Sequence, residues 1–139
     1  MIGVDGSPES QAALRWAVRE AGLRKAKLVV LHAWWAMPEL YLDAAAPIDD
    51  QEAGGERPST VHVDAFVDSV APEARSTVEL ETRAVQGIGA AEALLEAAKD
   101  AYLLVVGSRG LGGFSSLVLG SVSSQCVHHA PCPVVVVRS

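Results

Sequence analysis

The chain has 139 residues, 50% of them hydrophobic, and 11 basic against 17 acidic side chains give it a net charge of −6. This length accommodates one domain with a buried core that needs no metal or disulfide support. The acidic balance disfavours nucleic acid as the partner, because nucleic-acid binders need a basic surface, and the longest apolar run, residues 28–37, is far shorter than the roughly 20 residues that span a bilayer.

Residues 1–4 predict a short strand, followed by a turn and a helix. Ser7 suits the helix N-cap, Pro8 the first helical position, and Glu9 complements the positive end of the helix dipole. The strand-like run begins at the first residue, so we expect no signal peptide, and two cysteines are too few for a disulfide framework. We therefore expect a cytoplasmic protein whose residues 1–139 form a single domain.

The next elements are a strand and a loop. Residues 28–31 form a continuous apolar run, which is typical of a strand buried on both faces of a parallel sheet. Residues 38–60 contain three prolines, a Gly-Gly pair and six acidic side chains against one basic one. This composition predicts a long acidic surface loop that is compatible with partial disorder. The alternative is that the loop is a lid over a nearby site.

The remaining elements alternate. Helices are predicted over residues 61–70, 90–101 and 121–130, and strands over 78–85, 102–106 and 133–138. The whole order predicts an α/β three-layer sandwich with a parallel sheet of five strands and about four helices. Ligands bind such sheets beyond the carboxyl ends of the strands, which places Asp5, Ala33 and Gly107 in the candidate area.

The most informative stretch is Gly107-Ser108-Arg109-Gly110, followed after nine residues by Gly120-Ser121-Val122-Ser123. Backbone N–H groups at the start of a helix bind anions, and glycine lets a phosphate approach the backbone closely. The hydroxyls of Ser121 and Ser123 add donors, and either can also reach a metal ion. The competing interpretation is that these glycines only make turns.

No lysine follows these glycines, so the segment is not a Walker phosphate loop. The charge of a phosphate group would have to be met by Arg109, by backbone dipoles and by a bound cation. The same sequence offers no convincing general base for ATP hydrolysis.

The spacing G-x2-G-x9-G-S, running into a helix and then a Pro-Cys-Pro-Val-Val-Val-Val segment, resembles the nucleotide-binding signature of the universal stress protein family. The opening residues 3–10 and the run Leu31-His32-Ala33 match the same family. The resemblance covers nearly the whole chain. The acidic segment 38–60 and a short first strand depart from it.

The resemblance implies a Rossmann-like adenine nucleotide-binding fold with strand order 3-2-1-4-5. It implies ATP as the ligand, with Mg2+ held through the phosphates rather than by a protein metal cluster, and a homodimer formed through the last strand, Val134–Val137. The positions that it implies for nucleotide binding are Gly3, Val4, Asp5, Ala33, Gly107, Arg109, Gly110, Gly120, Ser121, Val122 and Ser123. In this arrangement Asp5 lies near the ribose and phosphates, and the backbone of Ala33 meets the adenine.

The function expected on this basis is that of an ATP-binding, nucleotide-dependent regulatory homodimer in the stress response, in which ATP closes the loops 38–60 and 107–119. The alternatives are a slow ATP hydrolase, a cyclic AMP-binding protein that uses the same pocket, and an interaction module that binds no nucleotide.

Several other residues have two interpretations. The pattern C-x-H-H-x-x-C at residues 126–132 suggests a metal site, but one helix cannot turn these side chains to a single point, and a helix end with a buried Cys126 is the simpler interpretation. We expect His32 to be packed or hydrogen-bonded rather than catalytic. For Trp34 and Trp35, stacking on an adenine is one interpretation, and a hydrophobic cover or a dimer contact is the other.

Overall fold

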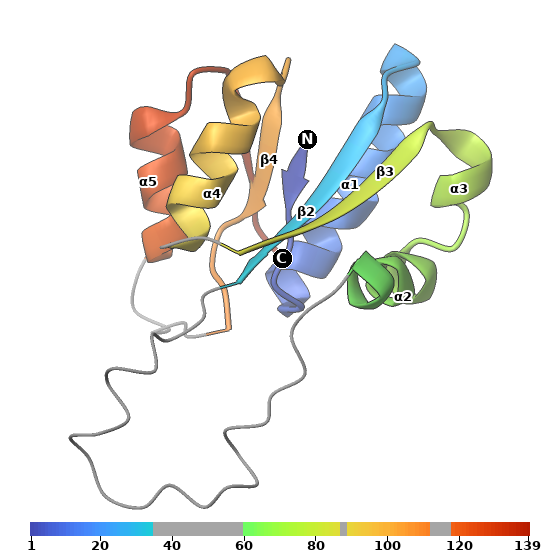
Figure 1. Cartoon of the computed structure of the whole chain (residues 1–139), viewed down its shortest axis with the longest axis horizontal. Helices are drawn as coiled ribbons and strands as arrows, with labels where there is room; N and C mark the ends of the chain where they lie inside the picture. Colours follow the sequence, from blue (N-terminus) through green and yellow to red (C-terminus); the bar gives the residue numbers. More distant parts are fainter. Residues whose placement is uncertain (35–59, 87–88, 112–117) are drawn as a thin grey trace, which may run out of the picture.

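A computed structural model describes residues 1–34, 60–86, 89–111 and 118–139, and its core is a parallel sheet (Figure 1). The sheet contains β1 (Ile2–Gly3), β2 (Leu28–Trp34), β3 (Leu80–Gln86), β4 (Leu104–Gly107) and β5 (Val134–Val137). Its strand order is β3-β2-β1-β4-β5, and every neighbouring pair is parallel. The predicted α/β class, five strands and order 3-2-1-4-5 are confirmed.

The helices in the described residues are α1 (Pro8–Arg24), α2 (Thr60–Val70), α3 (Ala74–Thr77), α4 (Ala90–Ala97) and α5 (Ser121–His129). Four of them were expected, and α3 is an additional short helix that delays the start of β3 to Leu80. The helix predicted over 90–101 ends earlier as an α-helix, because residues Ala98–Asp100 continue as a 3-10 turn. The predicted acidic loop lies outside the described residues except for Thr60, which opens α2.

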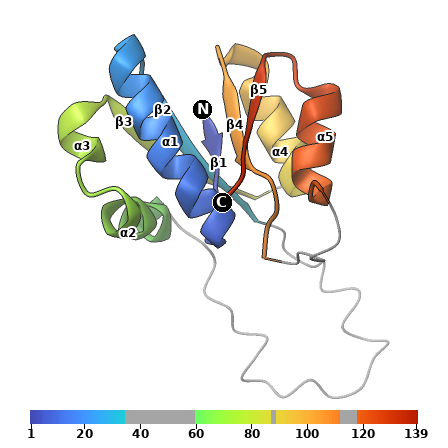
Figure 2. The ribbon, with the colours of Figure 1, turned by 180° about the vertical axis from the view of Figure 1, so that it is seen from behind.

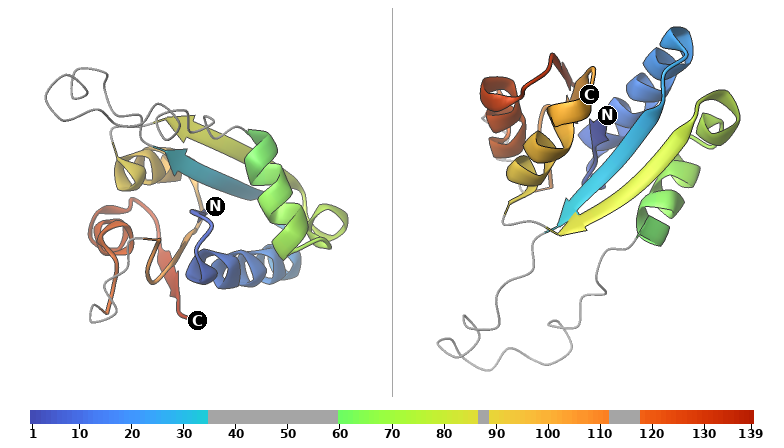
Figure 3. Two further views of the ribbon diagram at one scale, coloured as in Figure 1. Left: turned by 90° about the horizontal axis from the view of Figure 1, so that it is seen from below. Right: turned by 45° about the horizontal axis from the view of Figure 1, so that its top comes forward.

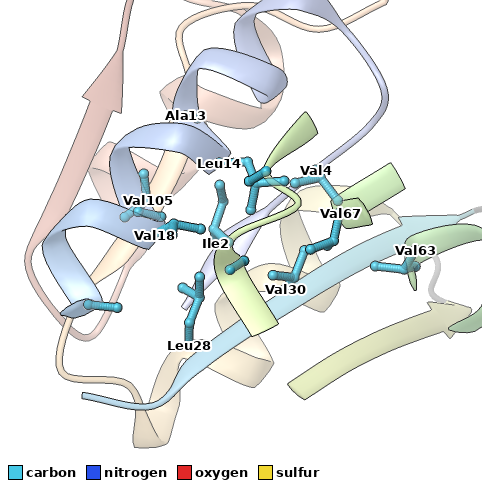
Figure 4. Close-up of a cluster of buried hydrophobic side chains, with 14 residues drawn as sticks. Ile2, Val4, Ala13, Leu14, Val18, Leu28, Val30, Val63, Val67 and Val105 are labelled. Atoms are coloured by element: carbon cyan, nitrogen blue, oxygen red, sulfur yellow. The ribbon is translucent and has the colours of Figure 1, made fainter. Parts of the chain in front are cut away.

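The helices form two layers, one on each face of the sheet (Figures 2 and 3). Helices α1, α2 and α3 cover one face, where Ile2, Leu14, Val30 and Val105 belong to a single buried cluster (Figure 4). Helices α4 and α5 cover the other face over a second cluster that includes Leu31, Leu94 and Cys126. Burial of apolar side chains on both faces explains the continuous hydrophobic runs at the start of β2 and along β4. The outer strand β3 is polar at several positions, and none of its residues is fully buried.

The strands end at the edge of the sheet where helices α1, α4 and α5 begin, in the lower part of Figure 1. Parallel strands place their carboxyl ends together, and each helix that follows a strand starts at that edge. Three helix N-termini therefore converge there. Among the described residues, no helix combines the length and the apolar character that a membrane crossing requires.

Candidate functional site

A pocket of about 580 Å³ opens at the carboxyl edge of the sheet. This volume is in the range of small-molecule binding sites. All eleven positions proposed from the sequence line it: Gly3, Val4, Asp5, Ala33, Gly107, Arg109, Gly110, Gly120, Ser121, Val122 and Ser123. The fold thus brings together residues from β1, β2, β4 and α5 that are up to 120 positions apart in the sequence.

The pocket has an apolar end, of which the sequence predicted Ala33 alone. Leu31, Ala90, Leu94 and Val106 complete it. Leu31 and Ala33 share one face of a strand, and Ala90 and Leu94 share one face of a helix, but core residues show the same periodicities, so these do not by themselves indicate a pocket. The apolar end provides a surface of the kind that a flat heterocycle packs against.

The polar end of the pocket contains the start of α5. Gly120 is the N-cap of this helix, and no side chain caps it among the described residues. The amide of Gly120 itself donates to the carbonyl of Ser108 at 2.7 Å. The amides of the following residues 121–123 have no acceptor within the helix, because the first turn of an α-helix offers none. With the positive end of the helix dipole, they form a surface suited to an anion.

The two serines of α5 have different surroundings. Ser121 is exposed, whereas Ser123 is buried with 3% of its surface exposed. The Oγ of Ser123 lies 2.9 Å from the carbonyl oxygen of Ser108 and 3.0 Å from that of Gly120. Its single hydroxyl proton is therefore donated to the backbone. The expectation that Ser123 offers a free hydroxyl donor is not met, and this side chain instead ties α5 to the end of β4.

Asp5 connects two of the converging loops. Its Oδ1 accepts from the amide of Ser7 at 3.0 Å and from the hydroxyl of Ser7 at 2.6 Å. Its Oδ2 accepts from the amide of Leu111 at 3.1 Å. The carboxylate thus fixes the turn after β1 and holds the loop after β4 across the mouth of the pocket.

The glycines of the motif also have packing reasons. A Cβ atom on Gly107 would lie 3.0 Å from the backbone and Cβ of Glu9, and one on Gly110 would lie 2.5 Å from Oδ2 of Asp5. A Cβ on Gly120 would lie 3.3 Å from the Cα of Arg109. Close packing against Glu9, Asp5 and Arg109 therefore accounts for these glycines independently of a ligand. Because a glycine has no side chain, its backbone is also accessible from the pocket.

Arg109 is the cationic side chain among the described residues that line the pocket. Its Nη2 lies 3.3 Å from Oε1 of Glu9 in the first turn of α1. The side chain of Arg109 is 34% exposed and that of Glu9 is 14% exposed. The guanidinium is therefore held at the side of the pocket by a carboxylate for which the sequence indicated only an interaction with the dipole of α1.

His32 is hydrogen-bonded, as expected. Its Nδ1 lies 2.8 Å from the carbonyl oxygen of Val4, which requires the proton on Nδ1. His32 lines a smaller cavity of about 250 Å³ near α2. Successive residues of a strand point to opposite faces, so Trp34 shares the face of His32 and not that of Ala33. Trp35 lies outside the described residues.

The end of α5 is built as a helix terminus. Cys126 is completely buried, and burial raises the pKa of its thiol to about 11, which keeps it protonated. Nδ1 of His128 lies 2.7 Å from the carbonyl oxygen of Ser124, one turn earlier. Cys126 is thus a protonated core residue, and His128 is hydrogen-bonded to its own helix.

A family model and the relatives with similar sequences both indicate the same protein family. The model of the universal stress protein family matches residues 1–138. A universal stress protein of Thermus aquaticus is 36% identical over 99% of this chain and 96% of its own length. A universal stress protein of Mycolicibacterium smegmatis is 35% identical over 99% of this chain but 47% of its own length, and one from Mycobacterium tuberculosis is 32% identical over 46% of its length. The chain spans about half the length of these mycobacterial relatives.

Solved structures agree with this result. A universal stress protein from Lactobacillus plantarum superimposes with a TM-score of 0.74 at 26% identity, over 99% of this chain and 96% of that chain. A universal stress protein whose crystal structure was determined in complex with cAMP gives a TM-score of 0.65 at 26% identity, over 98% of this chain and 92% of that chain.

Proposed function

The chain belongs to the universal stress protein family, and from this premise we propose that residues 1–139 form one domain that binds an adenine nucleotide in the pocket at the carboxyl edge of the sheet. The observation that carries the proposal is the joint position of an uncapped helix N-terminus and an apolar recess in a single pocket. A nucleotide has the matching division into an anionic phosphate part and a flat apolar base.

The proposed pose follows from this division. The phosphates lie against the amides of residues 121–123 and beside the hydroxyl of Ser121. The base lies in the recess next to Ala33 and Leu94, and the ribose lies between them, near Asp5. Gly3, Val4, Gly107 and Gly110 form the floor along which the ribose and phosphates approach the backbone.

We propose ATP with Mg2+ as the ligand, and cyclic AMP as the second candidate. The relative solved in complex with cAMP supports an adenine nucleotide in this fold. The described residues contain no group of three or more His, Cys, Asp or Glu side chains that could hold a metal ion, so the phosphates would supply most of its ligands. Ser121, whose hydroxyl lines the pocket, is the side chain that could also reach a phosphate-bound Mg2+, which would lower the negative charge of the phosphates.

The biological role that we propose is a cytoplasmic, nucleotide-dependent regulator in the stress response that acts as a homodimer. Strand β5 is one of the two outer strands of the sheet and consists of four valines, each of them partly exposed. An apolar sheet edge pairs readily with a second copy. The free thiols of Cys126 and Cys132 suit a reducing compartment.

The proposal is tested by calorimetric titration of the nucleotide-free protein with Mg-ATP, comparing the parent with Gly120→Val. The valine side chain would press on the backbone of Ser108 and Arg109 and displace the first turn of α5, whose amides hold the phosphates in the proposed pose, so we expect a loss of affinity of at least about 100-fold. Gly22→Val is the matched control, because Gly22 lies near the end of α1, where an added Cβ meets its nearest neighbour at 3.8 Å.

Binding by the parent and by Gly22→Val, with loss in a folded Gly120→Val, supports the site. Absence of binding in the parent contradicts it, and an unfolding curve for each variant separates loss of the site from loss of the fold. Competition between ATP and cAMP decides which nucleotide is preferred. Release of phosphate above the level of Ser121→Ala would favour the alternative of a slow ATP hydrolase.

A further inference from the structure

The cation of the pocket is paired with a carboxylate before any ligand arrives. Arg109 reaches Glu9 at 3.3 Å, and Glu9 is largely shielded from solvent. A charge pair that is partly removed from water is screened less than one on the surface. A phosphate group that used Arg109 would have to compete with Glu9 for the same guanidinium.

Glu9 is held in this place by the fold. The backbone and Cβ of Glu9 contact the end of β4 so closely that a Cβ on Gly107 would approach them to 3.0 Å. Glu9 also lies in the first turn of α1, where the helix dipole stabilises a carboxylate. The neighbouring hydroxyl of Ser10 donates to the carbonyl of Ser7 at 2.9 Å and fixes the same turn. The backbone that carries the Glu9 carboxylate is therefore fixed by α1 and by its packing against β4.

Among the described residues, Asp5 and Arg109 are the charged side chains that line the pocket, and Glu9 lies next to it, paired with Arg109. The site thus holds two carboxylates against one guanidinium. Arg109 is the single basic residue in the sequence from 107 to 123. An unchelated triphosphate carries about four negative charges and a cyclic monophosphate about one, since each further ionised phosphate oxygen adds one. Repulsion by the two carboxylates thus acts much more strongly on the first than on the second.

We propose that Glu9 is a specificity-determining residue of this site: by neutralising Arg109 it makes the pocket select adenine nucleotides of low phosphate charge, either a cyclic monophosphate or a triphosphate whose charge a divalent cation has reduced. This inference rests on the proposed function and deepens it. It gives Glu9, in the first turn of α1, a role in choosing the ligand.

The test measures dissociation constants for metal-free ATP and for cAMP in the parent and in Glu9→Gln, which keeps the shape of the side chain and removes its charge. We expect Glu9→Gln to tighten metal-free ATP about five- to tenfold and to change cAMP by less than about twofold. The gain should shrink as salt is added. In the double variant Glu9→Gln with Arg109→Gln, the gain should disappear.

The matched control is Glu20→Gln. Glu20 lies on the same helix and pairs with Arg24 at 2.6 Å, away from the pocket. It therefore reports the effect of one lost negative charge without a change at Arg109. A second measurement needs no variant: Mg2+ should tighten ATP binding by the parent and leave cAMP binding unchanged.

An ATP-to-cAMP ratio that Glu9→Gln leaves unchanged, or that Glu20→Gln changes equally, overturns the inference while the proposed function stands. The same holds if Mg2+ has no effect on ATP binding by the parent. A parent that binds neither nucleotide overturns the proposed function itself, and this inference with it.

Discussion

Helices α1 and α5 both begin at the carboxyl edge of the sheet, but a side chain caps the N-terminus of α1 and none caps that of α5 among the described residues. At α1, the Oγ of Ser7 accepts from the amide of Ser10 at 3.2 Å, and Asp5 accepts from the amide and hydroxyl of Ser7. At α5, the N-cap is Gly120, and no side chain caps the first turn among the described residues. The first terminus is closed by its own chain, and the second faces the pocket.

The difference shows how serines in similar positions acquire different roles. Ser7 and Ser123 are both buried. The hydroxyl of Ser7 accepts from the amide of Ser10 in α1 and donates to the carboxylate of Asp5, whereas the hydroxyl of Ser123 donates to the backbone carbonyl of Ser108 after β4. Ser121 is exposed at the pocket and has no hydrogen bond from its side chain within the described residues. A serine at a helix start is therefore evidence of a ligand only when its own chain leaves it and the neighbouring amides unoccupied.

The largest effect in this comparison is expected at Asp5, which contacts the closed terminus and the loop of the open one. Asp5→Ala removes acceptors for Ser7 and Leu111, and we expect it to lower the free energy of unfolding by about 2 kcal/mol. Urea denaturation measures this. Asp5→Asn keeps one acceptor oxygen, so it should lose about half as much; an equal loss would show that charge, and not the pair of bonds, holds the loops.

The closed terminus is tested next by Ser7→Ala. Loss of an N-cap serine leaves a backbone amide without its acceptor, and we expect the free energy of unfolding to fall by about 1 to 2 kcal/mol. Ser69→Ala is the control, since the hydroxyl of Ser69 is exposed and donates to the carbonyl of Phe66 at 2.9 Å. A thermal or urea unfolding curve in which both variants are alike would contradict the capping role.

Ser123→Ala tests the link between α5 and the end of β4. The buried hydroxyl donates to the backbone, and we expect its removal to cost about 1 kcal/mol of unfolding free energy. Nucleotide affinity should change little, because the hydroxyl does not face the ligand in the proposed pose. A selective loss of affinity at unchanged stability would mean that Ser123 does contact the nucleotide.

The smallest effect on stability is expected for Ser121→Ala, with less than about 0.5 kcal/mol. Its nucleotide affinity should nevertheless fall about three- to tenfold, because one hydrogen bond to a charged phosphate is lost. Calorimetry and an unfolding curve on the same preparation give both values. Unchanged affinity would place the phosphates away from this side chain.

Much of the fold could be predicted because its signals are local. Continuous apolar runs predicted β2, β4 and β5, and an alternating pattern predicted β3. Ser7-Pro8-Glu9 predicted the start of α1. Boundaries were less certain where tertiary contacts decide them: β3 begins at Leu80 rather than at residue 78, because Val78 is the C-cap of the short helix α3.

The glycines and serines of the candidate site were predicted from one motif, and Asp5 and Ala33 also from the family resemblance, whereas the rest of the apolar end was missed. Ala90 and Leu94 follow a different strand and have ordinary helix-core character in the sequence. Nothing local distinguishes a residue that packs in the core from one that lines a pocket at its border, because both are apolar and share the helical period.

The sequence by itself determined the alternation of strands and helices, the cap of α1 and the set of small residues at the carboxyl edge, because hydrophobic period and turn chemistry act over a few residues. The tertiary structure decided which of these groups remain available. It placed Glu9 on Arg109, turned the hydroxyl of Ser123 onto Ser108 and left the first turn of α5 uncapped. Such pairings join residues that are distant in the chain, and only the packing of β4 between α1 and α5 brings them within hydrogen-bonding reach.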